Sequence, residues 1–395
     1  FGILMGMFFI FIALVSNADD GVVVKRNSIL EFGFMAPVKD YTGKDETDPF
    51  LGLWNNEIGL DEILHAIKIA KEDPNIEGIS LTTNFLQAGI AQTREIREAL
   101  LDFKSTGKFV YAYSDFYTQK DYYLASVADE VYLNPVGTLD FKGLSTEILY
   151  FKDLQEKTGV KMEVIRHGKY KSAVEPFLSN TMSAENRLQI QELISSIWNV
   201  IVDDISTSRS ITPENLNVIA DTLGGRTPKY ALASGLVDGN LHFDQYEDLL
   251  REKVYFEKDE PLNYIKFEDY AFTANRKKVH TGTDKIAVIY ALGEIFYGEG
   301  SKDYIGQGLI VDALRKAKDN ENIKAIVLRV DSPGGSALVS DIIWREMELT
   351  KEEKPVVVSF GNVAASGGYY IGVGGDKIFA EPTTITGSIG VFGTI

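Results

Sequence analysis

The chain has 395 residues, more than one hydrophobic core usually organises, so its length excludes a single small module and predicts two domains or a duplicated unit. With 45% hydrophobic and 25% charged residues it has the composition of a globular protein, which excludes a disordered or fibrous chain. A formal net charge of -17, without a basic stripe, argues against nucleic acid as a partner.

Cysteine is absent from the chain and histidine is scarce. The lack of Cys removes disulfides, thiol nucleophiles and Cys-based zinc sites. The four histidines stand at no spacing typical of metal ligands, so we expect no metal site and no other cofactor. They are His65, His167, His242 and His280.

The first segment of the chain, residues 1–16, is apolar. Phe1 to Val15 are all apolar or Gly, with no initiator Met and no basic segment before them, so we expect a transmembrane anchor truncated at its start. As a helix this segment would reach about 22 Å, short of a hydrocarbon core of about 30 Å, and missing upstream residues would supply the rest. A cleaved signal peptide and a buried core helix are the alternatives.

An internal repeat dominates the rest of the sequence. Ile63 to Leu81 lies over Ile310 to Leu328 without a gap, and the same offset returns further along the chain. We therefore expect two homologous halves. Identical pairs include Ala66 and Ala313, Lys71 and Lys318, Asn75 and Asn322, Tyr122 and Tyr369, Tyr123 and Tyr370, and Pro135 and Pro382.

Both halves predict the same elements in the same order: an amphipathic helix, a strand, a second helix and a second strand. Strands that alternate with helices of this length indicate βαβ units, so we expect an α/β fold with a mostly parallel sheet in each half. The predicted strands are Gly78 to Leu81, Phe109 to Tyr113, Ala325 to Val330 and Pro355 to Phe360, and the second helices are Thr93 to Lys104 and Val339 to Lys351.

The segment between the repeats is helical in pattern, notably from Ala184 to Ser206, and Arg226 to Gly239 would close the first half with a short helix and a turn. The polar stretch from Arg276 to Asp284 marks the boundary. We assign residues 17–275 to an N-terminal domain (the first half) and residues 285–395 to a C-terminal domain (the second half). Because the chain stops in an apolar, Gly-spaced stretch, we expect further residues after Ile395.

Two Gly-rich turns occur only in the second half. Gly334 and Gly335 follow one predicted strand, and Ser366 and Gly367 follow the next, whereas Gln119 stands opposite Ser366 in the first half. A Ser between small residues at a strand-to-helix turn can present a hydroxyl nucleophile, and the nearby N–H groups can bind an oxyanion. The alternative is a pair of tight turns in which Gly supplies a positive φ and Ser caps a helix.

A Ser nucleophile needs a base, and without Cys or a well-placed His the choices are a carboxylate or a Lys with a lowered pKa. His167 is the nearest histidine in sequence, but no other feature supports it. Lys171 lies between an aromatic residue and small residues, and burial there would favour the neutral amine that accepts a Ser proton. A solvated Lys on a helix is the alternative.

At these residues the sequence resembles the bacterial protease IV family, the signal peptide peptidases of the SppA type, in its long two-domain form. The likeness covers nearly the whole chain. It is carried by Ser-Pro-Gly-Gly-Ser at residues 332–336, Ala-Ala-Ser-Gly-Gly-Tyr-Tyr at 364–370, Thr-Gly-Ser-Ile-Gly at 386–390 and Tyr-Lys-Ser-Ala-Val-Glu-Pro-Phe at 170–177.

The resemblance implies a role for each matching residue. Ser366 would be the nucleophile and Lys171 the general base of a Ser-Lys dyad, with Ser388 orienting the Lys amine. The N–H of Gly367 and one N–H from Gly334 or Gly335 would form the oxyanion hole. The first half would then have kept the Lys and lost the Ser turn, so that one composite site needs both halves.

The resemblance also implies the fold, partners and location. The halves would be tandem ClpP/crotonase-like domains in a homotetramer held at the bacterial inner membrane by one N-terminal anchor, with the catalytic domains on the extracytoplasmic side. The substrates would be residual signal peptides and other extended apolar peptides. Two alternatives are a crotonase-like enzyme acting on acyl thioesters and a catalytically inactive membrane scaffold.

Overall fold

The computed structural model describes residues 21–33, 36–43, 58–82, 84–257, 260–276 and 282–395. The anchor expected at residues 1–16 lies outside these ranges. Among the helices that are described, none is both long and apolar enough to cross a membrane.

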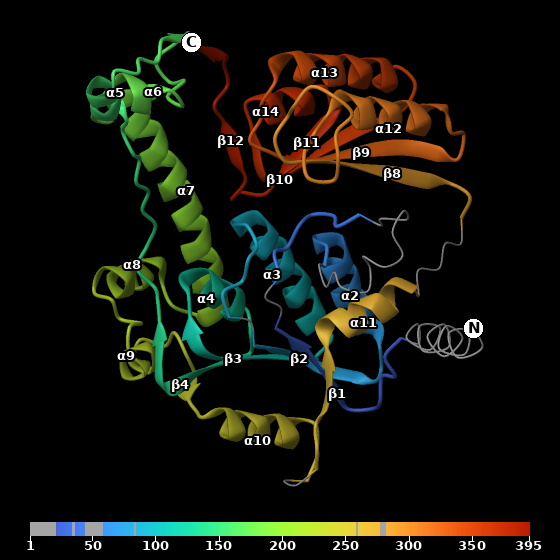
Figure 1. Ribbon diagram of the computed structural model, residues 1–395. Helices are drawn as coiled ribbons and strands as arrows, with labels where there is room; N and C mark the ends of the chain where they lie inside the picture. Colours follow the sequence, from blue (N-terminus) through green and yellow to red (C-terminus); the bar gives the residue numbers. More distant parts are fainter. Residues whose placement is uncertain (1–20, 34–35, 44–57, 83, 258–259, 277–281) are drawn as a thin grey trace, which may run out of the picture.

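The first half is built on a six-stranded sheet whose neighbouring strands are all parallel, in the order β6-β4-β3-β2-β1-β7. It lies in the lower body of Figure 1. Its strands are β1 (Ser28–Phe32), β2 (Ile76–Leu81), β3 (Phe109–Tyr117), β4 (Glu130–Leu139), β6 (Gly239–Asn240) and β7 (Asn263–Lys266).

Helices cover both faces of this sheet. On one face the buried sides of α2, α3, α4 and α11 pack against the strands in the main hydrophobic core. On the other face α10 places Tyr246 and Leu250 against Tyr111, Tyr113 and Tyr132. The helices of this half outside the long arm are α2 (Leu60–Glu72), α3 (Ile90–Lys104), α4 (Gln119–Ala125), α8 (Pro213–Asp221), α9 (Pro228–Ala233), α10 (Phe243–Lys253) and α11 (Phe267–Arg276).

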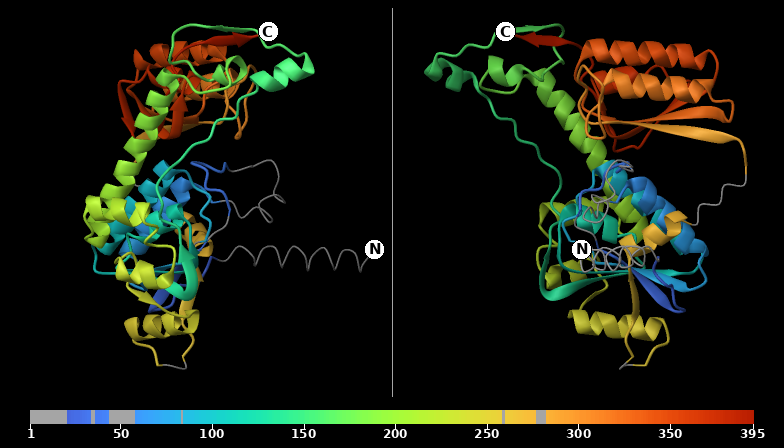
Figure 2. Two further views of the ribbon diagram at one scale, coloured as in Figure 1. Left: turned by 90° about the vertical axis from the view of Figure 1, so that its left-hand side faces the viewer. Right: turned by 45° about the vertical axis from the view of Figure 1, so that its right-hand side comes forward.

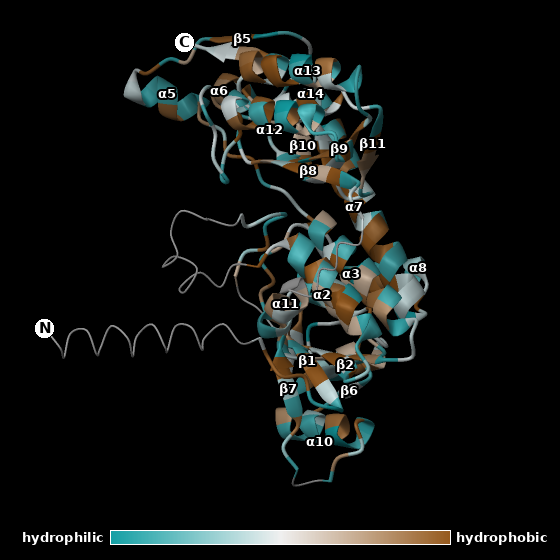
Figure 3. Ribbon diagram, turned by 90° about the vertical axis from the view of Figure 1, so that its right-hand side faces the viewer, coloured by the Kyte–Doolittle hydropathy of each residue, from teal (hydrophilic) through white to brown (hydrophobic). Residues whose placement is uncertain are grey.

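The second half forms a separate sheet in the order β11-β10-β9-β8, again parallel, with β12 added beside the end of β10. It has its own core, to which α12, α13 and α14 contribute. In Figure 3 hydrophilic and hydrophobic residues alternate along α12 and α13, as expected for helices with one buried face. The elements are β8 (Lys285–Leu292), α12 (Gln307–Asp319), β9 (Ile323–Ser332), α13 (Ala337–Lys351), β10 (Val356–Ala365), α14 (Gly367–Gly372), β11 (Lys377–Ala380) and β12 (Ile385–Gly387).

A long arm of the first half reaches the second sheet. After β4 the chain runs through α5 (Lys152–Thr158), β5 (Val164–Arg166) and α6 (Glu175–Leu178), and it returns along α7 (Ala184–Arg209). Figures 1 and 2 show α7 spanning the distance between the two bodies. At its far end β5 pairs antiparallel with β13 (Phe392–Thr394), which joins residues far apart in the sequence.

The α/β prediction and its parallel sheets are confirmed, and the predicted elements differ from the observed ones mainly at their ends. The helix predicted from Thr93 to Lys104 starts earlier, at Ile90, because Gly89 provides an extended N-cap before it. The strand predicted to end at Phe360 continues to Ala365 through a change of register. This extension places the end of β10 directly before Ser366.

Candidate active site

Ser366 occupies the turn between β10 and α14, where it is the N-cap of the helix. Its backbone has φ 51° and ψ -117°, a conformation that costs a residue with a Cβ about 1–3 kcal/mol and persists only where neighbours enforce it. The Ser366 N–H donates to the Gly387 carbonyl at 2.9 Å, and the Ser366 carbonyl accepts from Tyr370 N–H at 3.0 Å. The strained turn presents the hydroxyl at its tip, as a nucleophile turn does.

The turn at Gly334 and Gly335 packs directly against Ser366. A Cβ on Gly334 would lie 2.8 Å from the Ser366 Cβ, and both glycines have positive φ, 101° and 149°, so this turn requires glycine. The Gly334 amide is occupied, since it donates to Ser332 Oγ at 3.1 Å. A Cβ on Gly367 would lie 3.3 Å from the Gly335 nitrogen, which places the amides of Gly335 and Gly367 close together beside Ser366.

Lys171 reaches Ser366 from the arm of the first half. Its Nζ lies 3.3 Å from Ser366 Oγ and 2.9 Å from Ser388 Oγ, and it also contacts the Ser388 carbonyl. The residue is 4% exposed, and the Phe392 ring centroid lies 5.7 Å from Nζ. Burial lowers the pKa of the Lys171 amine, because an ammonium loses its hydration there. The alternative interpretation, a solvated lysine on a helix, does not hold for this residue.

The arm segment that carries Lys171 is fixed on both sides. Arg166, at the end of β5, donates to the Lys171 carbonyl at 3.1 Å. Four residues beyond Lys171, the buried Glu175 carboxylate accepts hydrogen bonds from Ser183 N–H and Ser183 Oγ, both at 2.7 Å. Burial alone would raise the pKa of Glu175, but the hydrogen bonds from Ser183 outweigh it and hold the pKa below its ordinary value. Glu175 thus closes the loop as an ionised cap.

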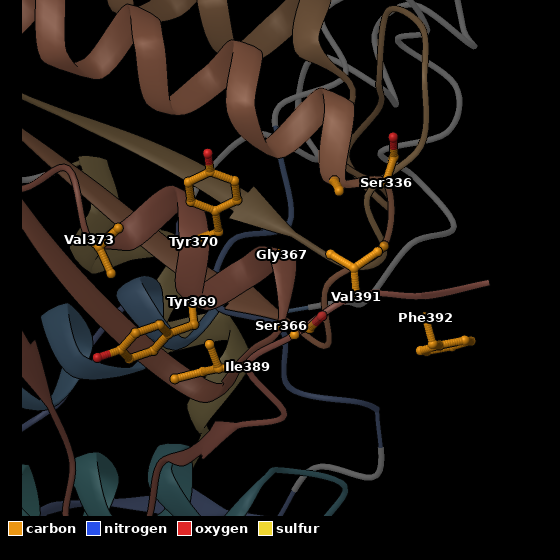
Figure 4. Close-up of a pocket in the computed structure, with 12 residues that line it drawn as sticks. Ser336, Ser366, Gly367, Tyr369, Tyr370, Val373, Ile389, Val391 and Phe392 are labelled. Carbon is orange, nitrogen blue, oxygen red and sulfur yellow. The ribbon is translucent and has the colours of Figure 1, made fainter. Parts of the chain in front are cut away.

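An apolar pocket of about 500 Å³ opens beside the Ser366 hydroxyl. Figure 4 shows Ser366 between the side chains of Ile389, Val391 and Phe392, with Tyr369 and Val373 further along the wall. In the part of the chain that the structure describes, no cluster of His, Asp and Glu is suited to a metal ion. The site can therefore bind an apolar side chain next to a hydroxyl, a lysine amine and two backbone amides.

The corresponding place in the first half is filled by side chains. Gln119, opposite Ser366, accepts hydrogen bonds from the N–H groups of Lys142 and Gly143 at 2.9 and 3.0 Å and donates to the Gly143 carbonyl. Phe141, opposite Ser388, is buried with its ring centroid 5.9 Å from that of Tyr122. This half retains the layout of the site without its reactive groups.

Sequence reasoning found the residues that meet in this site but missed some that support them. His167, its other candidate base, is exposed, whereas Lys171 is within reach of Ser366. The sequence did not point to Phe392 beside the Lys171 amine, or to Glu175 in the loop that follows Lys171. Glu175 belongs to the same motif as Lys171 and could have been noticed there, whereas Phe392 is placed by the pairing of β5 with β13 and has no local signal.

A serine hydroxyl beside a buried lysine amine, with two backbone amides and an apolar pocket, is an arrangement suited to acyl transfer. The model of the family described as peptidase family S49 matches residues 102–256 and 348–395, the segments that contain Lys171 and Ser366. The chain belongs to peptidase family S49, and the resemblance to protease IV is confirmed.

Several curated proteins are similar over most of the chain. Protease 4 of Haemophilus influenzae is 42% identical over 85% of this chain and 56% of its own length, and Protease 4 of Salmonella typhi is 40% identical over 86% and 56%. The chloroplastic serine protease SPPA of Arabidopsis thaliana is 32% identical over 87% of this chain and 52% of its own length. The chain thus spans about half the length of these relatives.

Two solved structures are more distantly similar. A membrane-bound stomatin-specific protease is 11% identical, with a TM-score of 0.32 over 62% of this chain and 95% of that one. An enoyl-CoA hydratase/isomerase family member is 13% identical, with a TM-score of 0.31 over 60% of this chain and 76% of that one.

Proposed function

We propose that the protein is a serine endopeptidase in which Ser366 is the nucleophile and Lys171 is the general base. The observation that carries this proposal is the approach of Lys171 Nζ to 3.3 Å from Ser366 Oγ in a buried site, with membership of a peptidase family in support. Burial lowers the pKa of Lys171, so a larger share of the amine is neutral and able to accept a proton.

The reaction follows from these positions. Neutral Lys171 takes the hydroxyl proton as Ser366 Oγ attacks the carbonyl carbon of a peptide bond. The Lys171 ammonium then returns this proton to the leaving amine, and an acyl group remains on Ser366. A water molecule, deprotonated by Lys171, attacks the ester carbonyl and releases the carboxylate product. Ser388 orients the Lys171 amine throughout.

The oxyanion of each tetrahedral intermediate would be bound by the amides of Gly335 and Gly367. We favour Gly335 over Gly334 because the Gly334 amide already donates to Ser332 Oγ. The Gly367 amide belongs to the first residue of α14 and has no acceptor within its own helix. Two amides beside the nucleophile supply the donors that acyl transfer requires.

We extend the proposal to the substrate, location and architecture. The apolar pocket fits extended apolar peptides, including signal-peptide remnants, and such substrates would be met by an enzyme anchored in the bacterial inner membrane with extracytoplasmic catalytic domains. Residues 17–275 would form the ClpP/crotonase-like domain that supplies Lys171, and residues 285–395 the domain that supplies Ser366, within a homotetramer.

The direct test is hydrolysis of a fluorogenic apolar peptide by the intact protein. Ser366→Ala and Lys171→Ala should each abolish turnover without changing the oligomeric state. Lys169→Ala is the matched control, because its side chain lies in the same arm but is 81% exposed, and it should retain activity. Full activity in either dyad variant would refute the proposal, and turnover of an acyl-CoA by Ser366→Ala would favour the thioester alternative.

A further inference from the structure

Strand β10 changes register immediately before Ser366. The β10 residues up to Phe360 pair one to one with β9, where Phe360 lies opposite Val330. The next paired residue of β10 is Ala364, opposite Ser332, so β10 advances four residues where β9 advances two. A bulge of this kind bends a strand and redirects the side chains that follow it. The direction of the Ser366 hydroxyl therefore depends on how the bulge at residues 361–363 is held.

Asp331 holds this bulge from β9. One carboxylate oxygen, Oδ1, accepts the Val363 N–H at 2.9 Å, and the other, Oδ2, accepts from Asn362 Nδ2 at 3.0 Å. The two bonds fix both the backbone of the bulge and the orientation of the Asn362 amide. The remaining polar atom of the Asn362 side chain, Oδ1, is thereby directed away from β9.

That oxygen contacts the first half of the chain. Asn362 Oδ1 accepts from the Gln92 N–H, in the first turn of α3, at 3.2 Å. A Cβ on Gly89, the N-cap of α3, would lie only 1.9 Å from Asn362 Oδ1. Gly89 has φ -70° and ψ 166°, which any residue adopts, so its lack of a side chain is required by Asn362 and not by the backbone. Helix α3 therefore completes the support of the bulge.

The equivalent positions of the first half do not form this link. Asn84 and Asp115 stand opposite Asp331 and Asn362 in the repeat. The Asn84 amide oxygen accepts from Ser114 Oγ, and Asp115 Oδ1 accepts from Asn134 Nδ2 at 2.7 Å. Each is engaged elsewhere, in the half that has no nucleophile.

We propose that Asn362 is a positioning residue for Ser366, and that it aims the nucleophile only when the N-terminus of α3 is docked against it. This inference rests on the proposed role of Ser366 as the nucleophile. The first half then contributes to the site at two places, through the Lys171 amine and through the end of α3. Neither Asn362 nor Gly89 lines the apolar pocket, so they act on the reaction and not on the binding of the substrate side chain.

Two substitutions on opposite sides of the contact test this coupling. Asn362→Ala should lower kcat about 10- to 100-fold with KM unchanged, because a small displacement of a reacting group is costly. Gly89→Ala should do the same, since its Cβ displaces the Asn362 amide. The double variant should be no worse than Asn362→Ala, because alanine at 362 leaves no amide to displace. Gly59→Ala, at the similarly extended N-cap of α2, is the matched control and should keep the kcat of the unmodified protein.

A second measurement does not depend on activity. In the Ser366→Ala background, hydrogen exchange at the Val363 amide should accelerate with Asn362→Ala and with Gly89→Ala but not with Gly59→Ala. Normal kcat in Asn362→Ala, or a double variant whose loss is the product of the two single losses, would overturn the positioning role. If the unmodified protein hydrolyses no peptide, the proposed function fails, and the exchange rates alone decide whether Asn362 and α3 hold the bulge.

Discussion

Lys171 Nζ lies 2.9 Å from Ser388 Oγ, closer than its 3.3 Å separation from Ser366 Oγ. Ser388, which follows β12, has a φ of 48°, and both its hydroxyl and its carbonyl contact the amine. A lysine side chain has four rotatable bonds and loses considerable freedom when it is held in one place. We therefore propose that Ser388 is the local restraint that keeps the amine beside Ser366.

Ser388→Ala should lower kcat about 10- to 100-fold and leave KM nearly unchanged, because the amine loses one partner while the Ser388 carbonyl continues to hold it. Steady-state kinetics with a fluorogenic apolar peptide measure both constants. Ser301→Ala, which removes an exposed hydroxyl of the same half that accepts the Asp303 N–H, is the control and should keep the kcat of the unmodified protein. Unchanged kcat in Ser388→Ala would remove Ser388 from the mechanism.

The pH dependence of the reaction should follow Lys171. Because burial lowers the pKa of Lys171 and the neutral amine is the base, kcat/KM should rise with pH and level off above an inflection below about 10.4, the value for a free lysine. Phe392→Ala should move this inflection upward, since water then reaches the amine, while Phe392→Leu, which keeps an apolar cover, should move it less. An inflection near about 6.5 that is insensitive to Phe392 would indicate a histidine base instead.

The order of the elements and the residues of the proposed dyad were both predicted from the sequence, but they rest on different signals. Hydrophobic periodicity and the internal repeat are local or near-local signals, so the helix at Thr93 to Lys104 and the strand at Ala325 to Val330 lie within the observed α3 and β9. The pairing of Lys171 with Ser366 was implied only by family resemblance. Its physical cause is an arm that crosses between the halves and pairs β5 with β13, and local periodicity does not signal such a long-range contact.

Contacts between the halves could not be predicted from either kind of signal. Gly89 is an extended N-cap with an ordinary φ, and nothing near it in the sequence shows that the Asn362 amide occupies the place of its side chain. The same holds for Arg329, whose partners Asp40 and Glu95 lie in the other half and become neighbours only when the two bodies dock. Such positions depend on the relative placement of the halves, which periodicity does not encode.

The apolar pocket should set the preference for the residue that precedes the cleaved bond. A pocket of about 500 Å³ lined by apolar side chains favours leucine over alanine there, and each methylene buried is worth about 10-fold or more in kcat/KM. Val373→Trp should fill the pocket and reverse the ratio of kcat/KM for matched leucine and alanine peptides. Leu309→Trp, at an exposed position of α12, should leave the ratio unchanged. A ratio that Val373→Trp does not alter would show that the substrate side chain binds elsewhere.

The docking of the two halves should depend on the charge of Arg329. Its guanidinium, on β9, bonds Asp40 at 2.5 Å and Glu95 of α3 at 2.6 Å, and all three side chains are largely buried. Arg329→Ala leaves two buried carboxylates without their cation and should lower the free energy of unfolding by about 3–5 kcal/mol at neutral pH. Urea denaturation measures this loss. Arg315→Ala, which removes an exposed partner of Glu346, is the control and should cost much less.

The decrease in the free energy of unfolding caused by Arg329→Ala should also depend on pH, and its direction can be derived from Glu95. Burial raises the pKa of Glu95, and Arg329 opposes that rise, so removing Arg329 raises the pKa further. A carboxyl whose pKa is raised by folding stabilises the folded state below its unfolded pKa, and this contribution is lost as the pH rises through the folded pKa. The variant should therefore recover part of its stability as the pH falls below neutral, because the Glu95 carboxyl then takes up a proton. A deficit that is constant over this range, or that grows on acidification, would show that Arg329 stabilises the docked halves by packing and not by its charge.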